Sequence, residues 1–86
     1  MSKADKAKER LKQRPKDYTY TEARTLLTHL GFKELQKGKT SGSRVKYYRE
    51  KDQKIMLLHK PHPGDVMDRG AVTDLLNYLT AIGEMK

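Results

Sequence analysis

The hydrophobic positions of the chain predict two helices. Between residues 20 and 30, apolar side chains recur at i, i+3, i+4 and i+7, which places them on one face of a helix. Thr19 and Glu22 have the spacing of a capping box at its start, and Gly31 is suited to its end. The same spacing near the end of the chain predicts a second helix, carried by Val72, Leu75, Leu76, Leu79 and Ile82.

Three short segments between these helices have the composition of strands. They cover residues 32–37, 44–50 and 54–60, and polar turns at 38–43 and 51–53 connect them. Turns this short join antiparallel neighbours, so the segments predict a three-stranded antiparallel meander. The chain is therefore predicted to form a two-layer α+β domain in the order α-β-β-β-α, with both helices on one face of the sheet.

Alternation along the strands predicts which side chains face these helices. In the second strand, two side chains are expected to point inward and three outward: Val45 and Tyr47 inward, and Arg44, Lys46 and Tyr48 outward. In the third strand, Ile55 and Leu57 are expected inward, which would expose Lys54, Met56, Leu58 and Lys60. The outer face would then be cationic, with apolar and aromatic side chains between the charges.

Residues 1–17 are predicted to form a basic flexible tail ahead of the domain at residues 18–86. They contain seven basic and three acidic residues, and Leu11 is nearly the only large apolar side chain after Met1. The composition suits a helix, but it offers no apolar stripe that would dock one, and Pro15 would end it. The segment is either a basic arm that lies along phosphates or a solvated leader, and its composition favours the leader.

The charge of the chain indicates an anionic partner. Lys and Arg number 19 against 11 Asp and Glu, which gives a net charge of +8 with neutral histidines. Eight of the basic residues fall between Lys37 and Lys60, so the predicted sheet and its turns are the basic part of the domain. Nucleic acid is the first partner expected for such a surface and an acidic protein the second, whereas solubility alone is the simplest explanation.

Length and composition exclude several classes of protein. The 86 residues are too few for a multidomain enzyme, and the absence of cysteine excludes disulfides, zinc fingers and thiol catalysis. No apolar run is long enough to cross a bilayer, and the amino-terminal residues are too charged for a signal peptide. We therefore expect a cytoplasmic protein that uses no membrane and no cofactor.

Two histidines beside the basic strands offer acid–base chemistry. His59 and His62 flank Pro61 in a spacing that resembles a metal-binding pair with Asp65 as a third ligand, but so few ligands do not predict a metal site. A histidine next to cations is suited to cleave RNA, because it can take the proton of the 2′-hydroxyl while the cations stabilise the phosphate. The residue types alone favour a plainer interpretation, in which His59 closes the strand and His62 is a solvated loop residue.

Four phrases along the chain occur in the order and spacing of a known family. They are Leu30-Gly31-Phe32 after the first helix, Gly42-Ser43 before the second strand, His59 at the end of the third strand, and the helix from Gly70-Ala71-Val72 to Leu79. In these phrases, over about residues 18–83, the chain resembles the HicA family of small mRNA-cleaving toxins from bacterial toxin–antitoxin pairs. The resemblance implies the fold of double-stranded-RNA-binding domains, an endoribonuclease activity on mRNA and an acidic HicB-like antitoxin as partner.

One phrase departs from the family pattern. Family members typically read Gly-Ser-His, and that histidine is catalytic, whereas this chain reads Gly42-Ser43-Arg44. Arginine stays protonated at neutral pH and cannot act as a general base. The catalytic residues expected here are therefore His59 and His62, and the residues expected to bind RNA phosphate are Arg44, Lys46, Lys39, Lys60 and Ser43. The alternatives are a non-catalytic RNA-binding module of the same fold and a protein-interaction module that docks an acidic partner.

Overall fold

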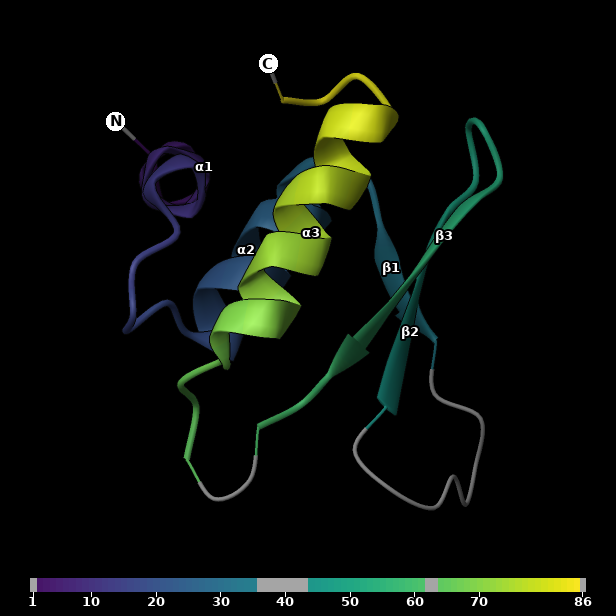
Figure 1. Ribbon diagram of the computed structural model, residues 1–86. Helices are drawn as coiled ribbons and strands as arrows, with labels where there is room; N and C mark the ends of the chain where they lie inside the picture. The colour runs from purple at the N-terminus through teal and green to yellow at the C-terminus, as the bar shows by residue number, and fades with distance from the viewer. Residues whose placement is uncertain (1, 36–43, 62–63, 86) are drawn as a thin grey trace.

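The computed structural model describes residues 2–35, 44–61 and 64–85 (Figure 1). The elements in this part of the chain are α1 (Lys3–Gln13), α2 (Tyr20–His29), β1 (Lys33–Leu35), β2 (Arg44–Arg49), β3 (Lys54–His59) and α3 (Arg69–Ala81). The strands form one antiparallel sheet in the order β1-β2-β3. The predicted α+β fold, with three strands between two helices, is confirmed, and α1 precedes it as an additional helix. No described helix has both the length and the apolar character needed to cross a membrane.

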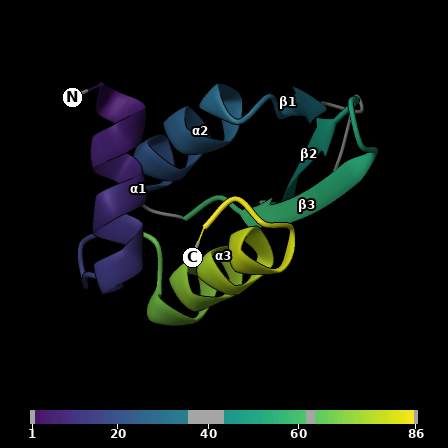
Figure 2. The same cartoon turned by 90° about the horizontal axis from the view of Figure 1, so that it is seen from above.

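The helices and the sheet form three layers. Figure 2 shows α2 and α3 on one face of the sheet, and α1 on the side of these two helices that faces away from it. The fully buried leucines of α2 and α3, with Tyr47 of β2, fill the space between helices and sheet. None of the described helices lies on the second face of the sheet. It is therefore the face that the described part of the fold leaves open to a partner.

The ends of α2 form as the sequence predicts. The hydroxyl of Thr19 accepts the backbone N–H of Glu22 at 3.1 Å, and the carboxylate of Glu22 accepts the N–H of Thr19 at 3.0 Å. At the other end, Gly31 has a φ of 96°, a left-handed conformation that favours glycine. The N–H of Phe32 then donates to the carbonyl of Leu27 at 2.9 Å, which turns the chain from α2 into β1.

Residues 1–17 differ from the flexible tail that the sequence predicts. The helix α1 begins with a capping box between Ser2 and Asp5 and buries Ala4, Ala7 and Leu11. These three positions have the spacing i, i+3, i+7 of one helix face, which a search for large apolar side chains alone overlooks. Because alanine side chains are small, α1 packs closely against α2 and covers the side of the helix layer that faces away from the sheet.

The facing predicted for β3 is wrong. The register pairs Val45 with Leu58 and Tyr47 with Met56, and cross-strand partners share a face of a sheet. Met56 and Leu58 are therefore buried under the helices, whereas Ile55 and Leu57 are 46% and 53% exposed. Alternation within the strand does not settle its facing, because residues 55 to 58 are all apolar. The inward facing predicted for Tyr47 is confirmed.

Arg49 is a buried cation rather than part of the basic surface. Only 2% of it is exposed, and its guanidinium donates to both carboxylate oxygens of Asp52 at 3.0 and 2.6 Å, to Glu84 and to the carbonyl of Leu30 at 3.2 Å. The guanidinium carbon lies 4.9 Å from the centre of the Phe32 ring. The hydrogen bond with Asp52 is the main cause of the raised pKa of Arg49 and of the lowered pKa of Asp52. One side chain thus joins the β2–β3 turn, the end of α2 and the segment after α3.

Tyr78 in α3 buries a hydroxyl that has no hydrogen-bond partner in the described part of the chain. Its ring packs edge-on against Phe32, with 6.4 Å between the ring centres, and burial raises the pKa of the hydroxyl. Phenylalanine would keep the ring and remove the unsatisfied group. We expect Tyr78→Phe to leave the free energy of unfolding unchanged or raise it by up to about 1 kcal/mol, as measured by urea denaturation. A loss of more than about 1 kcal/mol would contradict this account.

Candidate functional site

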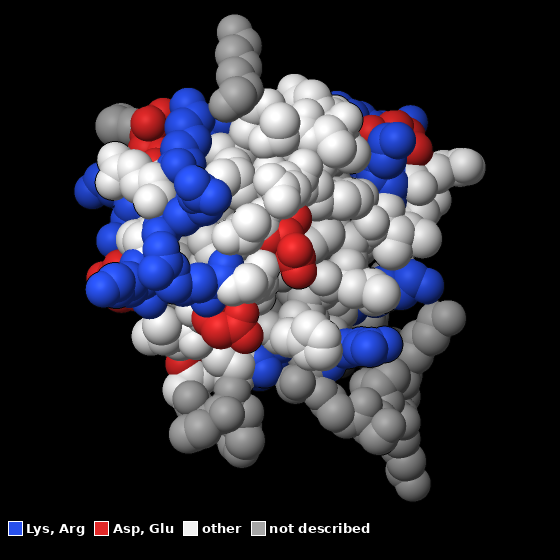
Figure 3. All heavy atoms as spheres, viewed as in Figure 1, with Lys and Arg blue, Asp and Glu red and all other residues white. Residues whose placement is uncertain are grey.

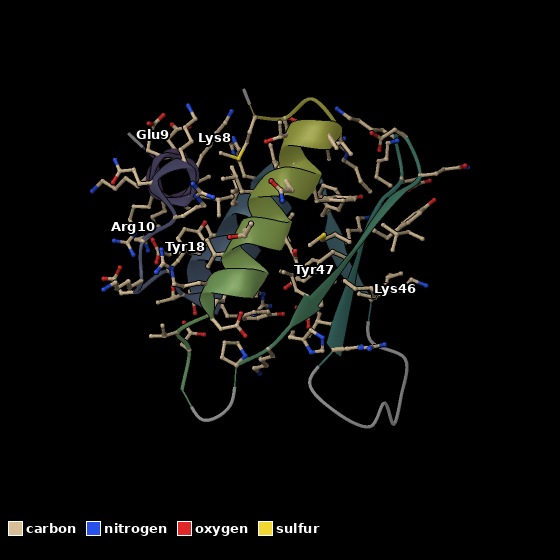
Figure 4. All side chains as sticks on the ribbon, viewed as in Figure 1. Lys8, Glu9, Arg10, Tyr18, Lys46 and Tyr47 are labelled. Carbon is tan, nitrogen blue, oxygen red and sulfur yellow. The ribbon has the colours of Figure 1, made fainter. Side chains whose placement is uncertain are left out.

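The uncovered face of the sheet carries cationic and apolar side chains together. The registers of β1 with β2 and of β2 with β3 place eight residues on it, and we call them the open sheet face: Lys33, Leu35, Arg44, Lys46, Tyr48, Ile55, Leu57 and His59. Figure 4 shows the alternation directly, because Lys46 points away from the helices while Tyr47, the next residue, points toward them. The β2 side chains on the open sheet face are the ones predicted from the sequence. The β3 side chains on it are the ones that were predicted to face the helices.

Arg44 and His59 lie directly across from one another on this face. Arg44 is the first residue of β2 and His59 the last residue of β3, and the register pairs them. Directly opposed residues of an antiparallel pair have Cβ atoms about 4.5–5.5 Å apart. Both residues are exposed. A guanidinium and an imidazole therefore lie side by side in solvent at the end of the sheet. The guanidinium can bind a phosphate, and the imidazole can accept or donate a proton next to that phosphate.

One lysine adds to the cations of this face. Lys46 lies two residues along β2 on the open sheet face. The exposed Lys60 follows His59 directly, after the end of β3, and is not among the eight residues that the registers place on this face. Among the described residues, no ion pair occupies Arg44, Lys46 or Lys60. Their charges are therefore available to an anion. Three further residues expected at the site, Lys39, Ser43 and His62, lie outside the described part of the chain.

A buried tyrosine pair holds the strand on which Arg44 and Lys46 stand. The hydroxyl of Tyr47 in β2 lies 2.7 Å from that of Tyr20 in α2. Burial raises the pKa of both hydroxyls, so the two remain protonated at neutral pH and share a hydrogen bond. This bond fixes the centre of β2 to the helix layer and leaves the opposite face of the strand to the cations.

Sequence reasoning missed the apolar residues of the open sheet face. Leu35, Ile55 and Leu57 are 37%, 46% and 53% exposed, and all three belong to this face. The run of four apolar residues in β3 signals that one apolar pair must face outward, but only the register with β2 shows which pair. Lys46 lies between Leu35 and Leu57 in the sheet, so the apolar side chains alternate with the cations of the central strand. Exposed large apolar side chains among charges are typical of a surface that a partner covers.

Asp65, considered with the two histidines as a metal ligand, has a structural role. Its carboxylate accepts the N–H of Thr21 at 3.2 Å, and its carbonyl accepts the N–H of Tyr20 at 2.7 Å. These bonds join the loop before α3 to the start of α2. Within the described residues, no group of three or more acidic, histidine or cysteine side chains is placed to hold a metal ion.

Lys and Arg side chains gather on two sides of the molecule. Figure 3 shows them over α1 and, on the other side, along the sheet, with the largely uncharged surface of α3 between them.

Comparison with known proteins identifies the family of the chain. The family model described as HicA toxin of bacterial toxin–antitoxin matches residues 20–80, whereas searches of curated proteins and of solved structures gave no match. The match covers more than half of the 86 residues, from the start of α2 almost to the end of α3, and the chain belongs to the HicA toxin family.

Proposed function

We propose that this HicA-family chain cleaves mRNA at the end of the open sheet face, with His59 as the general base. The observation that carries the proposal is the direct pairing of Arg44 with His59 across two strands. The family pattern has its catalytic histidine at the position of Arg44. An imidazole on the opposed residue stands one cross-strand spacing away, about 4.5–5.5 Å between Cβ atoms, and is suited to take over the proton transfer.

The chemistry proposed uses the nucleophile that RNA itself carries. His59 removes the proton of a 2′-hydroxyl, and the resulting oxygen attacks the adjacent phosphorus. The bond from phosphorus to the 5′ oxygen breaks, which leaves a 2′,3′-cyclic phosphate and a 5′-hydroxyl that takes up a proton. Arg44, Lys46 and Lys60 stabilise the negative charge on the phosphate as it develops. His62 is the candidate acid for the leaving oxygen, on its place in the sequence three residues after His59.

The same face is our candidate for neutralisation by an acidic HicB-like antitoxin. Carboxylates of the antitoxin would pair with Arg44 and Lys46, and apolar side chains would cover Leu57 and Ile55. Apolar contacts beside charge pairs are typical of a protein–protein interface. Bound in this way, the antitoxin would exclude RNA from His59.

Replacing Arg44 with histidine restores the family phrase and tests the proposal. Arg44→His would place a second imidazole opposite His59, so we expect it to raise the rate of RNA cleavage by about tenfold or more, given that a positioned acid or base contributes about 100-fold. Cleavage would be followed on denaturing gels with and without EDTA, and 2′-O-methyl RNA should remain intact. Arg69→His at the exposed start of α3 is the matched control. Equal rates for the two variants would contradict the proposed placement of the reaction.

The replacement of the family histidine by Arg44 specifically favours one alternative, a non-catalytic RNA-binding module. That alternative predicts RNA that stays intact with the wild-type protein and a strong dependence of binding on salt. Binding to an acidic partner without any affinity for RNA would instead favour a protein-interaction module.

A further inference from the structure

The helix α1 forms a basic surface that the HicA family match does not include. The match begins at residue 20, after α1 has ended. Figure 2 shows α1 on the side of the helix layer that faces away from the sheet, so its cations lie apart from Arg44 and His59. Any ligand of α1 therefore binds outside the proposed catalytic site.

Polar contacts as well as apolar packing hold α1 in place. The Tyr18 hydroxyl donates to the carbonyl of Ala7 at 2.9 Å, and the Arg10 guanidinium contacts Glu22 at 2.6 Å and Asp17 at 3.0 Å. The apolar face of α1, which ends on the fully buried Leu11, lies in the core. This face is therefore unavailable for insertion into a membrane, and what α1 offers to a partner is its charged side.

Half of the net charge of the protein lies in this segment. Residues 1–17 hold seven basic and three acidic residues, which is four of the eight net positive charges. Figure 3 shows Lys and Arg side chains gathered over α1, with a few Asp and Glu side chains among them. Four exposed cations of the segment have no ion pair among the described residues: Lys3, Lys6, Arg14 and Lys16. Lys12 has one weak exposed contact, 3.4 Å from Glu9.

The chemistry of this surface fits a phosphate backbone better than a protein. The exposed large apolar side chains of the described residues are Leu35, Ile55, Leu57 and Val66, and none belongs to α1. Protein interfaces have an apolar centre, whereas contacts to nucleic acid phosphates use Lys and Arg without one. From Lys3 to Lys12, nine residues of helix rise by about 13 Å along the axis, so the cations are distributed along the length of α1.

We propose that α1 is a second nucleic-acid contact, which binds the phosphodiester backbone apart from the cleavage site. The inference extends the proposed function, because it takes the RNA substrate as the polyanion. It assigns Lys3, Lys6 and Lys12 to sequence-independent binding, while the open sheet face holds the reacting phosphate. With α1 added to the domain that the family model matches, the protein would bind long RNA strands more tightly, and the residues at the site of cleavage would be unchanged.

Salt dependence of binding tests this proposal with charge-matched variants. The triple variant K3Q/K6Q/K12Q removes three exposed cations and keeps good helix formers, and the control K51Q/K54Q/R69Q removes three exposed cations elsewhere. Binding to single-stranded 2′-O-methyl RNA, which the proposed reaction cannot cleave, would be titrated from about 50 to 200 mM salt. For the α1 variant we expect the slope of log K against log salt to fall by about 2, at about 0.7 per lost contact. For the control we expect a fall of less than about 0.7. Glu9→Gln, which removes a negative charge from the same surface, is expected to tighten binding.

The outcomes separate this inference from the proposed function. Equal slopes for the α1 variant and the control would overturn the inference, even if RNA is cleaved and His59 is required. A reduced slope for the α1 variant, in a protein that does not cleave RNA, would support α1 and contradict the proposed reaction. The same titration with duplex DNA shows whether α1 distinguishes between nucleic acids. If the α1 variant lowers the salt slope equally for duplex DNA and for RNA, α1 binds any phosphodiester backbone. Binding of an acidic protein that depends on these lysines, without any effect on nucleic acid, would overturn the proposal.

Discussion

Arg49→Met is expected to lower the free energy of unfolding by about 3 kcal/mol, the lower end of the cost of removing one partner from a buried ion pair. Arg49 satisfies two carboxylates and the carbonyl of Leu30 at once, and its guanidinium lies over the Phe32 ring. Methionine can fill part of the volume but can donate no hydrogen bond. Since Asp52 and Glu84 are partly exposed, water can solvate them in the variant, which keeps the loss near the lower limit. For a domain of this size, the Tm should fall by about 12 °C or more.

An exposed ion pair provides the control for this prediction. Arg24 lies 3.5 Å from Glu34, and 62% of its side chain is exposed. Arg24→Met should therefore cost less than about 1 kcal/mol. Arg49→Lys should fall between the two, because one ammonium group cannot reproduce the paired contact with Asp52. If Arg49→Met and Arg24→Met lowered the Tm equally, the Arg49 network would not stabilise the fold in the way described.

His59→Ala is expected to lower the rate of RNA cleavage by about 100-fold or more, the usual contribution of a positioned acid or base. The side chain is exposed at the end of β3, so its removal should change the free energy of unfolding by no more than about 0.5 kcal/mol. Single-turnover cleavage of a labelled RNA would measure the rate, and thermal unfolding would show that the variant remains folded. RNA affinity should change little, because Arg44, Lys46 and Lys60 remain.

His29→Ala is the matched control for this effect. His29 is exposed in the last turn of α2, which lies behind the sheet rather than on its open face. The rate should therefore stay within about twofold of the wild-type rate, the range of a surface change with no part in the reaction. Should His59→Ala retain the wild-type rate as well, His59 would not be the general base, even though the chain belongs to the HicA family.

The ends of the elements were predictable wherever a local rule applies. The capping box of Thr19 and Glu22 and the turn at Gly31 depend on hydrogen bonds within a few residues, and both form as expected. The facing of β3 was not predictable, because its four central residues are all apolar and the register with β2 decides it. The buried face of α1 was not predictable, because two of its three residues are alanines. An alanine contributes to packing only when a second helix lies close to it, which the sequence does not show.

The candidate site was also only partly predictable from the sequence. Its residue types and the departure at Arg44 are visible in the sequence, which also gave the resemblance to the family that was later matched. The pairing of Arg44 with His59 and the exposure of Leu57 follow from the ladder between two strands. Arg49 shows the opposite case: it looks like one cation of a basic strand, and it is buried because Asp52, Glu84 and Phe32 surround it.

By itself, the sequence determined the order of helices and strands, the net positive charge and the family. These properties follow from local spacing and from composition, which act along the chain and need no knowledge of distant contacts. Only the tertiary structure decided which β3 residues are exposed, that α1 packs on the helix layer, and which cations are left without carboxylate partners. Those outcomes depend on contacts between residues far apart in the sequence, such as Arg49 with Glu84 and Arg10 with Glu22, whose geometry exists only once the layers have packed.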